Sequence, residues 1–160
     1  MRFSQRLKAI FSLVDGDILA DIGTDHAFLP INACRANIVK RAIACDVSSG
    51  PLKIAAQNIQ QYDLSDKIDV RLGFGLQPLQ PNEADCIVIA GLGGINIIQI
   101  LEQLQIQPLL LKNSLILQPQ RDLAAVKLFL AKLNIPITAE ITAHDRNREY
   151  PIIKAQKQPK

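Results

Sequence analysis

Apolar and polar positions follow two rhythms along this chain, one typical of amphipathic helices and one typical of buried strands. After Pro51, apolar side chains recur at the spacing of one helix face, with lysine and glutamine between them: Leu52, Ala55, Ala56 and Ile59. Short apolar runs elsewhere read as parallel strands covered on both faces, over 18–22, 41–46, 84–90 and 114–117. The pattern therefore predicts alternating strands and helices.

Helix start and stop signals separate these runs. Ser4 can cap a first helix that Gly16 would end, with an apolar face of Leu7, Ile10, Phe11 and Val14. Later helices are expected from near Pro30, from Ser48-Ser49-Gly50-Pro51, from Gly94 to about Gln105, and over 122–133.

Three further runs complete the expected sheet. A short strand is expected at 68–72, and two final strands, about 136–143 and 149–155, are joined only by the loop His144–Arg148. Helical crossovers make neighbouring strands parallel, whereas so short a loop makes the last pair antiparallel. We therefore expect an α/β fold: a doubly wound, mostly parallel, seven-stranded Rossmann-like sheet with an antiparallel C-terminal edge hairpin. It would form one domain over 1–160, with an N-terminal helix in 1–16 and a frayed tail at 155–160.

Composition narrows the class of protein without deciding its function. Apolar residues make up 48% of the 160 residues and the net charge is +3, which indicates a globular domain that tolerates a polyanionic partner. No apolar run is long enough for a membrane span, and the basic start lacks the apolar core of a signal peptide. The cysteines, without CxxC spacing, are expected to be buried thiols in a cytoplasmic protein that binds no metal: Cys34, Cys45 and Cys86.

The most informative stretch is Leu19–His26, where a strand ends at a glycine and acidic residues follow. A strand that stops at a glycine before a helix opens a nucleotide-type site in a doubly wound sheet. Here Asp25 stands where a dinucleotide fingerprint would have its second glycine, and Asp46 closes the next strand. Together with Asp21, these carboxylates would repel a pyrophosphate and suit a cation that carries a ribose. S-adenosylmethionine, with its sulfonium and ammonium groups, fits this description.

Each of these residues has a functional interpretation and a structural alternative. Gly23 would let the backbone approach the ligand, or form only a tight turn. Asp46 would accept hydrogen bonds from both ribose hydroxyls, or cap the turn that begins at Val47. Asp21 would hold the loop or the methionine ammonium, and Phe74 would pack on adenine or belong to the core.

Three strings of the sequence resemble the bacterial tRNA (adenine-22-N1)-methyltransferases. In chain order they are Ala20-Asp21-Ile22-Gly23-Thr24-Asp25-His26-Ala27-Phe28-Leu29-Pro30, Ile87-Val88-Ile89-Ala90-Gly91-Leu92-Gly93-Gly94 and Leu115-Ile116-Leu117-Gln118-Pro119-Gln120. The resemblance runs to about Lys154. It implies that S-adenosylmethionine binds across the carboxyl ends of the strands and that the methyl group goes to N1 of an adenine in tRNA. Family members generally continue into a helical C-terminal domain, which we expect this chain to lack.

The resemblance and the strand ends together define the expected site. The cofactor-binding residues would be Asp21, Gly23, Asp46, Val47, Gly73, Phe74, Gly75, Ala90 and Gly91. For transfer, Asp25 would stabilise the cationic product ring, or it would hold the loop or the ammonium as Asp21 would. His26 would position the base or accept a proton, or be only structural. Gln118 would read the base edge or cap a turn. The target adenine would be unpaired or flipped out of its stack. The tRNA would contact Gly93, Gly94, Pro119, Arg121, Arg146, Arg148 and Tyr150. The phosphates of the tRNA would bind to the arginines. Alternatively, the hairpin loop that carries Arg146 and Arg148 is only a solvated turn.

Two other classes of function stay open from the sequence. The alternative interpretation is a cofactor-binding module that is catalytically idle or needs a partner subunit. An NAD-dependent oxidoreductase is disfavoured because G-x-G-x-x-G is absent and the expected pocket is acidic.

Overall fold

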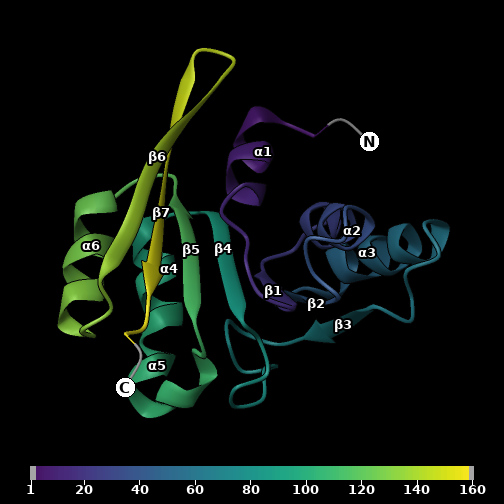
Figure 1. Ribbon diagram of the computed structural model, residues 1–160, viewed down its shortest axis with the longest axis horizontal. Coiled ribbons are helices and arrows are strands. Elements are labelled where there is room, and N and C mark those ends of the chain that lie inside the picture. Colours follow the sequence, from purple (N-terminus) through teal and green to yellow (C-terminus); the bar gives the residue numbers. More distant parts are fainter. Residues whose placement is uncertain (1–2, 159–160) are drawn as a thin grey trace.

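The computed structural model of the protein describes residues 3–158, which form one seven-stranded sheet with helices on both faces (Figure 1). The strand order is β3-β2-β1-β4-β5-β7-β6, and β7 runs antiparallel to both of its neighbours whereas the other pairs are parallel. The doubly wound sheet with an antiparallel edge hairpin is thereby confirmed. Its strands are β1 (Ile18–Ile22), β2 (Arg41–Asp46), β3 (Ile68–Leu72), β4 (Cys86–Leu92), β5 (Ser114–Pro119), β6 (Ile137–Asp145) and β7 (Arg148–Gln156).

The helices divide between the two faces of the sheet according to where their apolar residues point. One core, which includes Ile10, Ile31 and Ile59, packs under the first three helices: α1 (Gln5–Phe11), α2 (Phe28–Arg35) and α3 (Ser49–Gln61). The other core packs under the later helices: α4 (Gly94–Leu101), α5 (Gln103–Ile106), the 3-10 turn η1 (Pro108–Leu110) and α6 (Leu123–Lys132).

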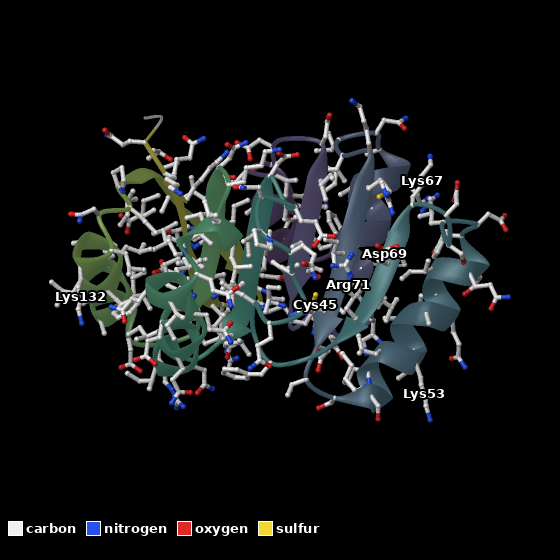
Figure 2. All side chains as sticks on the ribbon, turned by 90° about the horizontal axis from the view of Figure 1, so that it is seen from below. Cys45, Lys53, Lys67, Asp69, Arg71 and Lys132 are labelled. Carbon is white, nitrogen blue, oxygen red and sulfur yellow. The ribbon has the colours of Figure 1, made fainter. Side chains whose placement is uncertain are left out.

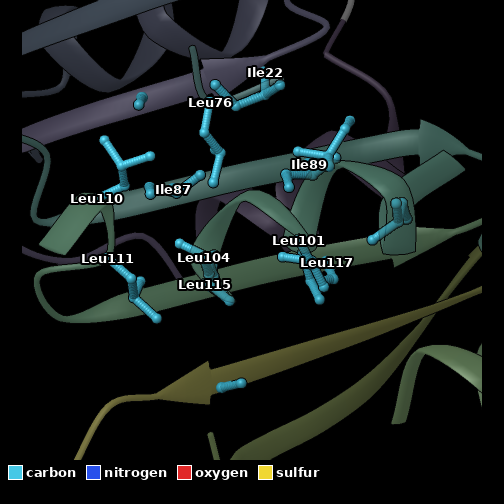
Figure 3. Close-up of a cluster of buried hydrophobic side chains, with 14 of the residues drawn as sticks. Ile22, Leu76, Ile87, Ile89, Leu101, Leu104, Leu110, Leu111, Leu115 and Leu117 are labelled. Atoms are coloured by element: carbon cyan, nitrogen blue, oxygen red, sulfur yellow. The ribbon is translucent and has the colours of Figure 1, made fainter. Parts of the chain in front are cut away.

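Strand β4 shows why both faces need cover. Ile87 and Ile89 belong to one core and Cys86 and Val88 to the other, because successive side chains of a strand alternate between faces. All four are fully buried, which explains the continuous apolar run in the sequence. Figure 3 shows the first core, in which the residues of β4 meet those of β5 and of the covering helices: Leu101, Leu104, Leu115 and Leu117.

A charged network at the edge strand β3 anchors the loop that follows it. The Arg71 guanidinium donates to both carboxylate oxygens of Glu83 (2.8 and 2.7 Å), to Asp69 (3.1 Å) and to the carbonyl of Pro78 (3.0 Å). Figure 2 shows Arg71 and Asp69 on β3. Both ends of the loop from 73 to 83 are thereby tied to the sheet, and this loop carries Phe74 and Gly75.

Several expected boundaries are wrong. Ser4 does cap α1, accepting from the Leu7 amide at 3.2 Å, but the helix ends at Phe11, before Val14. The Ser12 hydroxyl donates to the Ala9 carbonyl and so competes with the helical pattern. The isoleucine-rich helix breaks after Leu101 into α4 and α5.

The hairpin and the tail also differ from expectation. The loop is not His144–Arg148, because the strands continue to Asp145 and resume at Arg148. Only Arg146 and Asn147 turn, with φ of 49° and 61°, as in the tight turns that match strand twist. Ala155 and Gln156, expected to be frayed, belong to β7, and Ala155 is fully buried. The end of the expected tail, 159–160, lies outside the described residues.

Candidate cofactor and substrate site

The carboxyl ends of the parallel strands meet at one edge of the sheet and bring together the residues singled out in the sequence. The amides of Gly23 and Thr24 both donate to the Cys45 carbonyl at 2.9 Å, and the Gly73 amide donates to the Asp46 carbonyl at 3.0 Å. The turns after β1, β2 and β3 are therefore tied side by side. Gly23 has φ of +75°, which favours glycine, and the position of its missing Cβ is open space.

An open cleft of about 330 Å³ lies over these turns. Val47 and Phe74 flank it and are 64% and 42% exposed, so Phe74 is not a core residue. Two exposed apolar side chains beside a carboxylate, Asp46, suit an aromatic base joined to a ribose. The lining is Ile22, Gly23, Asp46, Val47, Gly73, Phe74, Gly75, Leu92, Asn96, Gln99 and Ile100.

Asp46 caps the turn after β2, as one of its two interpretations predicted, and keeps one carboxylate oxygen free. One carboxylate oxygen accepts from the Ser48 amide at 2.9 Å and so caps the turn after β2. The other oxygen has no hydrogen-bond partner among residues 3–158 and belongs to the lining of the cleft. An acceptor with a free oxygen at this place can bind hydroxyl groups.

A smaller pocket of about 100 Å³ adjoins the first, since Gly23 lines both. It contains the remaining acidic candidates, Asp21 and Asp25, together with His26 and Ala90. Phe28 and Leu29 from the start of α2 and Arg6, Leu7 and Ile10 from α1 enclose it, with Thr24.

Asp21 is the only buried carboxylate of this pocket among the described residues, with 7% of its surface exposed. Burial raises the pKa of the Asp21 carboxyl from 3.8 to about 6, although a hydrogen bond from the Thr24 hydroxyl (2.8 Å) opposes the rise. The neighbouring Asp46 raises it further. A cationic ligand group at this carboxylate would relieve the cost of its burial.

Asp25 and His26 form a more exposed pair at the mouth of the same pocket. His26 Nε2 lies 3.4 Å from Asp25 Oδ1, an ion pair only when the imidazole is protonated. The His26 ring stacks on Phe28, with centroids 5.3 Å apart and planes 20° apart. Asp25 has a left-handed backbone conformation (φ 56°) in the turn between β1 and α2.

Gln118 is buried and its amide already has partners. Its Oε1 accepts from Arg6 Nη1 (3.1 Å) and from the Gly91 amide (3.2 Å), and its Nε2 donates to the Pro119 carbonyl (3.0 Å). The Gln118 side chain therefore connects Arg6 and Gly91 at the end of β5. To hydrogen-bond to a base, Gln118 would have to give up one of these hydrogen bonds.

The turns after β4 and β5 are joined to each other beside Gln118. The Gly94 amide donates to the Arg121 carbonyl at 3.0 Å, and a Cβ at Gly94 would lie 2.6 Å from that oxygen. Gly93 lies under the Arg121 guanidinium. Gly91, Gly93, Gly94, Pro119 and Arg121 line none of the clefts described here.

A third cleft, larger than the other two at about 760 Å³, lies between α1 and the β6–β7 hairpin. Of the residues expected to meet tRNA, Arg146 and Tyr150 line it and Arg148 does not. The rest of its wall is Phe3, Ser4, Gln5, Arg6, Lys8, Gln120 and Asp145. Side chains of α1 thus reach the site, which the sequence reasoning missed because an amphipathic pattern does not tell where the polar face of a helix points.

Other missed residues come from α4. Asn96 and Gln99 stand one turn apart and both line the 330 Å³ cleft. Their signal in the sequence is a pair of amides three residues apart on a helix that begins directly after Gly91-Leu92-Gly93-Gly94.

Two further properties follow from the described part of the chain. Over residues 3–158 no group of three or more His, Cys, Asp and Glu side chains is placed to hold a metal ion, and no helix is long and apolar enough to cross a bilayer. The three cysteines are buried and unpaired, and burial raises the pKa of the Cys45 thiol to about 12.

The sheet order, the helices on both faces and the clefts along the carboxyl edge define a class I methyltransferase type of domain. Residues 3–153 match the family described as "Methyltransferase domain". The chain is 33% identical to the tRNA (adenine(22)-N(1))-methyltransferase of Bacillus subtilis over 157 residues, covering 98% of this chain and 66% of that protein. It belongs to the family of these methyltransferases.

Solved structures agree with this assignment. The crystal structure of the B. subtilis M1A22 tRNA methyltransferase TrmK superimposes with a TM-score of 0.92 at 32% identity, over 98% of this chain and 67% of that one. M. capricolum TrmK in complex with S-adenosyl-homocysteine gives 0.87 at 30% identity, over 98% and 69%. The chain thus spans about two thirds of the length of these relatives.

Proposed function

We propose that this chain binds S-adenosylmethionine and transfers its methyl group to N1 of an adenine in tRNA. The observation that carries the proposal is the adjacency of three cavities at one sheet edge: a cleft with Asp46, a pocket with Asp21 and Asp25, and a cleft with Arg6 and Arg146. The first two suit a cationic nucleoside and the third suits a polyanion. The B. subtilis relative, a tRNA (adenine(22)-N(1))-methyltransferase, supports the choice of substrate.

The cofactor would lie across the first two cavities. Asp46 would accept hydrogen bonds from ribose hydroxyls through its free oxygen, and Phe74 would cover the adenine ring. Asp21 would face the ammonium, whose positive charge compensates a buried carboxylate. The Gly23 turn leaves open space between these two groups.

When bound, S-adenosylmethionine supplies a methyl group that bonds to the N1 lone pair as the carbon–sulfur bond breaks, leaving a neutral thioether and a cationic adenine. No general base is needed before attack, since neutral N1 already carries its lone pair. The protein's contribution is alignment, for which proximity supplies roughly 7–11 kcal/mol. Asp25, at the mouth of the acidic pocket, would stabilise the charge that develops on the ring, and His26 stacked on Phe28 would position the base.

The experiment that tests the proposal combines calorimetry with a transfer assay. We expect S-adenosylmethionine to bind with a dissociation constant of about 1–100 µM and NADH not to bind. Radiolabelled methyl should enter unmodified tRNA and be recovered as N1-methyladenosine. Asp46→Ala should weaken cofactor binding by about 1–3 kcal/mol through lost hydrogen bonds. The matched control is Asp66→Ala, an exposed acid near the amino edge, which should bind normally.

A second candidate function is a cofactor-binding module that is idle or completed by a partner. It is supported by the separation of the cavities, because the two that suit the cofactor do not include Arg146 or Tyr150, which line the cleft that would bind tRNA. Cofactor binding without methyl transfer to tRNA would select it. Binding of NADH in place of S-adenosylmethionine would refute both candidates.

A further inference from the structure

Arg6, on the N-terminal helix, is the side chain that joins two cavities of the site. It lines both the 760 Å³ cleft between α1 and the hairpin and the 100 Å³ acidic pocket. A residue at this junction meets whatever enters the acidic pocket from the basic cleft.

Tertiary contacts hold the Arg6 guanidinium firmly in place. Its Nη1 donates to Gln118 Oε1 at 3.1 Å, and its Cζ lies 5.7 Å from the centroid of the Tyr150 ring. Gly91 leaves the room for it, since a Cβ there would stand 2.9 Å from Nη1 and the φ of +78° disfavours other residues. Side chains from α1, β5 and β7 and the backbone of β4 therefore all contribute to one arginine position.

The charge of Arg6 is left available to a ligand. Among residues 3–158 no carboxylate lies within salt-bridge distance of it, and Gln118 is its only hydrogen-bond acceptor. Lys8 and Arg146 line the same cleft, with Asp145 as the single acid there. A planar guanidinium with unused N–H groups in a basic cleft suits a phosphate.

The proposed chemistry decides which part of a nucleotide Arg6 meets. Methylation at N1 makes the adenine ring cationic, so a guanidinium at N1 would oppose the reaction. A phosphate group remains negative throughout and gains from the contact. The acids Asp21 and Asp25 line the acidic pocket, where the ring would react, and do not line the 760 Å³ cleft that Arg6 also lines.

We propose that Arg6 is a positioning residue that binds the phosphate of the target nucleotide at the entrance to the acidic pocket. The inference rests on the proposed function and adds a recognition group from α1 to it. The fixed bond to Gln118 orients the guanidinium, so that the nucleotide is held at one depth relative to the cofactor.

The test compares Arg6→Gln and Arg6→Lys with wild type. Arg6→Gln keeps a hydrogen-bond donor and removes the charge. It should raise KM and the dissociation constant for tRNA about 10- to 100-fold and lower the salt slope of log K by about 1. The maximal rate, the cofactor affinity and the melting temperature should stay near wild type. Arg6→Lys should restore the salt slope and part of the affinity.

A matched control exists at the last residue of α2. Arg35 also lies over a tyrosine ring, with its Cζ 4.7 Å from the Tyr62 centroid, and lines none of the three site cavities. Arg35→Gln loses the same kind of contact and should leave KM and salt slope unchanged.

The outcomes separate this inference from the proposed function. An unchanged KM and salt slope in Arg6→Gln, with an active wild type, would overturn the role of Arg6 alone. Equal losses of stability and cofactor affinity in Arg6→Gln and Arg6→Lys would show a structural role and also overturn it. A wild-type chain that binds no tRNA would refute the proposed function and this inference together.

Discussion

Two aspartates, Asp21 and Asp85, are buried to the same extent but at opposite edges of the sheet. Each is 7% exposed. Asp21 lies on β1, and Asp85 directly precedes β4, the strand that pairs with β1. Asp85 lies at the amino edge, away from the clefts, whereas Asp21 lies at the carboxyl edge in the acidic pocket. The two carboxylates differ in how far their neighbours compensate the negative charge.

Asp85 is fully compensated by its own chain. One oxygen accepts from the amides of Asp17 and Ile18, both at 2.9 Å, and the other lies 2.7 Å from Lys112 Nζ. Burial alone would raise the pKa of Asp85, but the hydrogen bonds from Lys112 and the two amides lower it below its usual value.

Asp21 receives one side-chain hydrogen bond, from Thr24. The charge of Arg6 lowers the pKa of Asp21, but burial and the neighbouring acids Asp46 and Asp25 raise it, so the compensation within the chain is only partial. The contrast teaches that a buried carboxylate that is fully paired within its chain has no need of a ligand, whereas one that is incompletely paired would gain from a cationic ligand.

The largest expected effect concerns the structural member of the pair. Asp85→Ala removes the acceptor of two amides and the partner of Lys112, and should lower the free energy of unfolding by about 3 kcal/mol at pH 7 in urea titrations. Because the folded pKa is lowered, this contribution is present above the unfolded pKa and is lost as pH falls through the folded one. A decrease in the free energy of unfolding of less than about 1 kcal/mol at neutral pH would contradict the structural role of Asp85. Asp66→Ala, at an exposed acid, is the control.

The opposite sign is expected at Asp21. A raised folded pKa means that stability is complete below 3.8 and is lost as pH rises through about 6. Asp21→Asn escapes that loss and should gain about 2 kcal/mol of unfolding free energy at pH 7.5 and nothing near pH 4. Denaturation at both pH values checks this, and a variant less stable than wild type at pH 7.5 would contradict it.

The pH dependence of cofactor affinity should be next in size. If the ammonium pairs with ionised Asp21, binding below pH 6 must release its proton, so the dissociation constant should rise about tenfold, or about 1.4 kcal/mol, from pH 7 to pH 5. Calorimetry in two buffers of different ionisation enthalpy counts the proton. Asp21→Asn should bind more weakly and without this pH dependence; a flat profile in wild type would argue that Asp21 does not meet the charge.

The smallest expected effect is at the single hydroxyl that supports Asp21. Thr24→Val removes the 2.8 Å hydrogen bond, so the pKa of Asp21 should rise further and stability at pH 7.5 should fall by about 1 kcal/mol. In the Asp21→Asn background the same change should cost less. A double-mutant cycle measures the coupling, and zero coupling would mean that Thr24 acts elsewhere.

Much of this site follows from local sequence. Gly23, Asp46 and Phe74 were expected beside the cofactor because each stands at or just after the end of a predicted strand, and the 330 Å³ cleft does contain all three. Strand ends can be located from an apolar run and the turn residue that closes it. Parallel strands then bring those ends to one edge whatever their order.

The contacts of Gln118 could not be predicted from the local sequence. Its place at the end of β5 was expected, but its hydrogen bonds to Arg6 and Gly91 join positions 112 and 27 residues apart. Short-range patterns carry no information on such pairs. The same reason hid Asn96 and Gln99, whose helix could have presented either face to the cleft.

The sequence by itself determined the alternation of strands and helices, the turns that end β1 to β4, and the family strings, because burial and turn chemistry act on neighbouring residues. Tertiary structure alone decided that α1 covers the site, that Arg6 lines two cavities and that Asp21 is only partly compensated while Asp85 is paired. These properties depend on the strand order β3-β2-β1-β4-β5-β7-β6, which brings distant segments together. Charge compensation in particular is a property of packed neighbours, not of the chain around the charge.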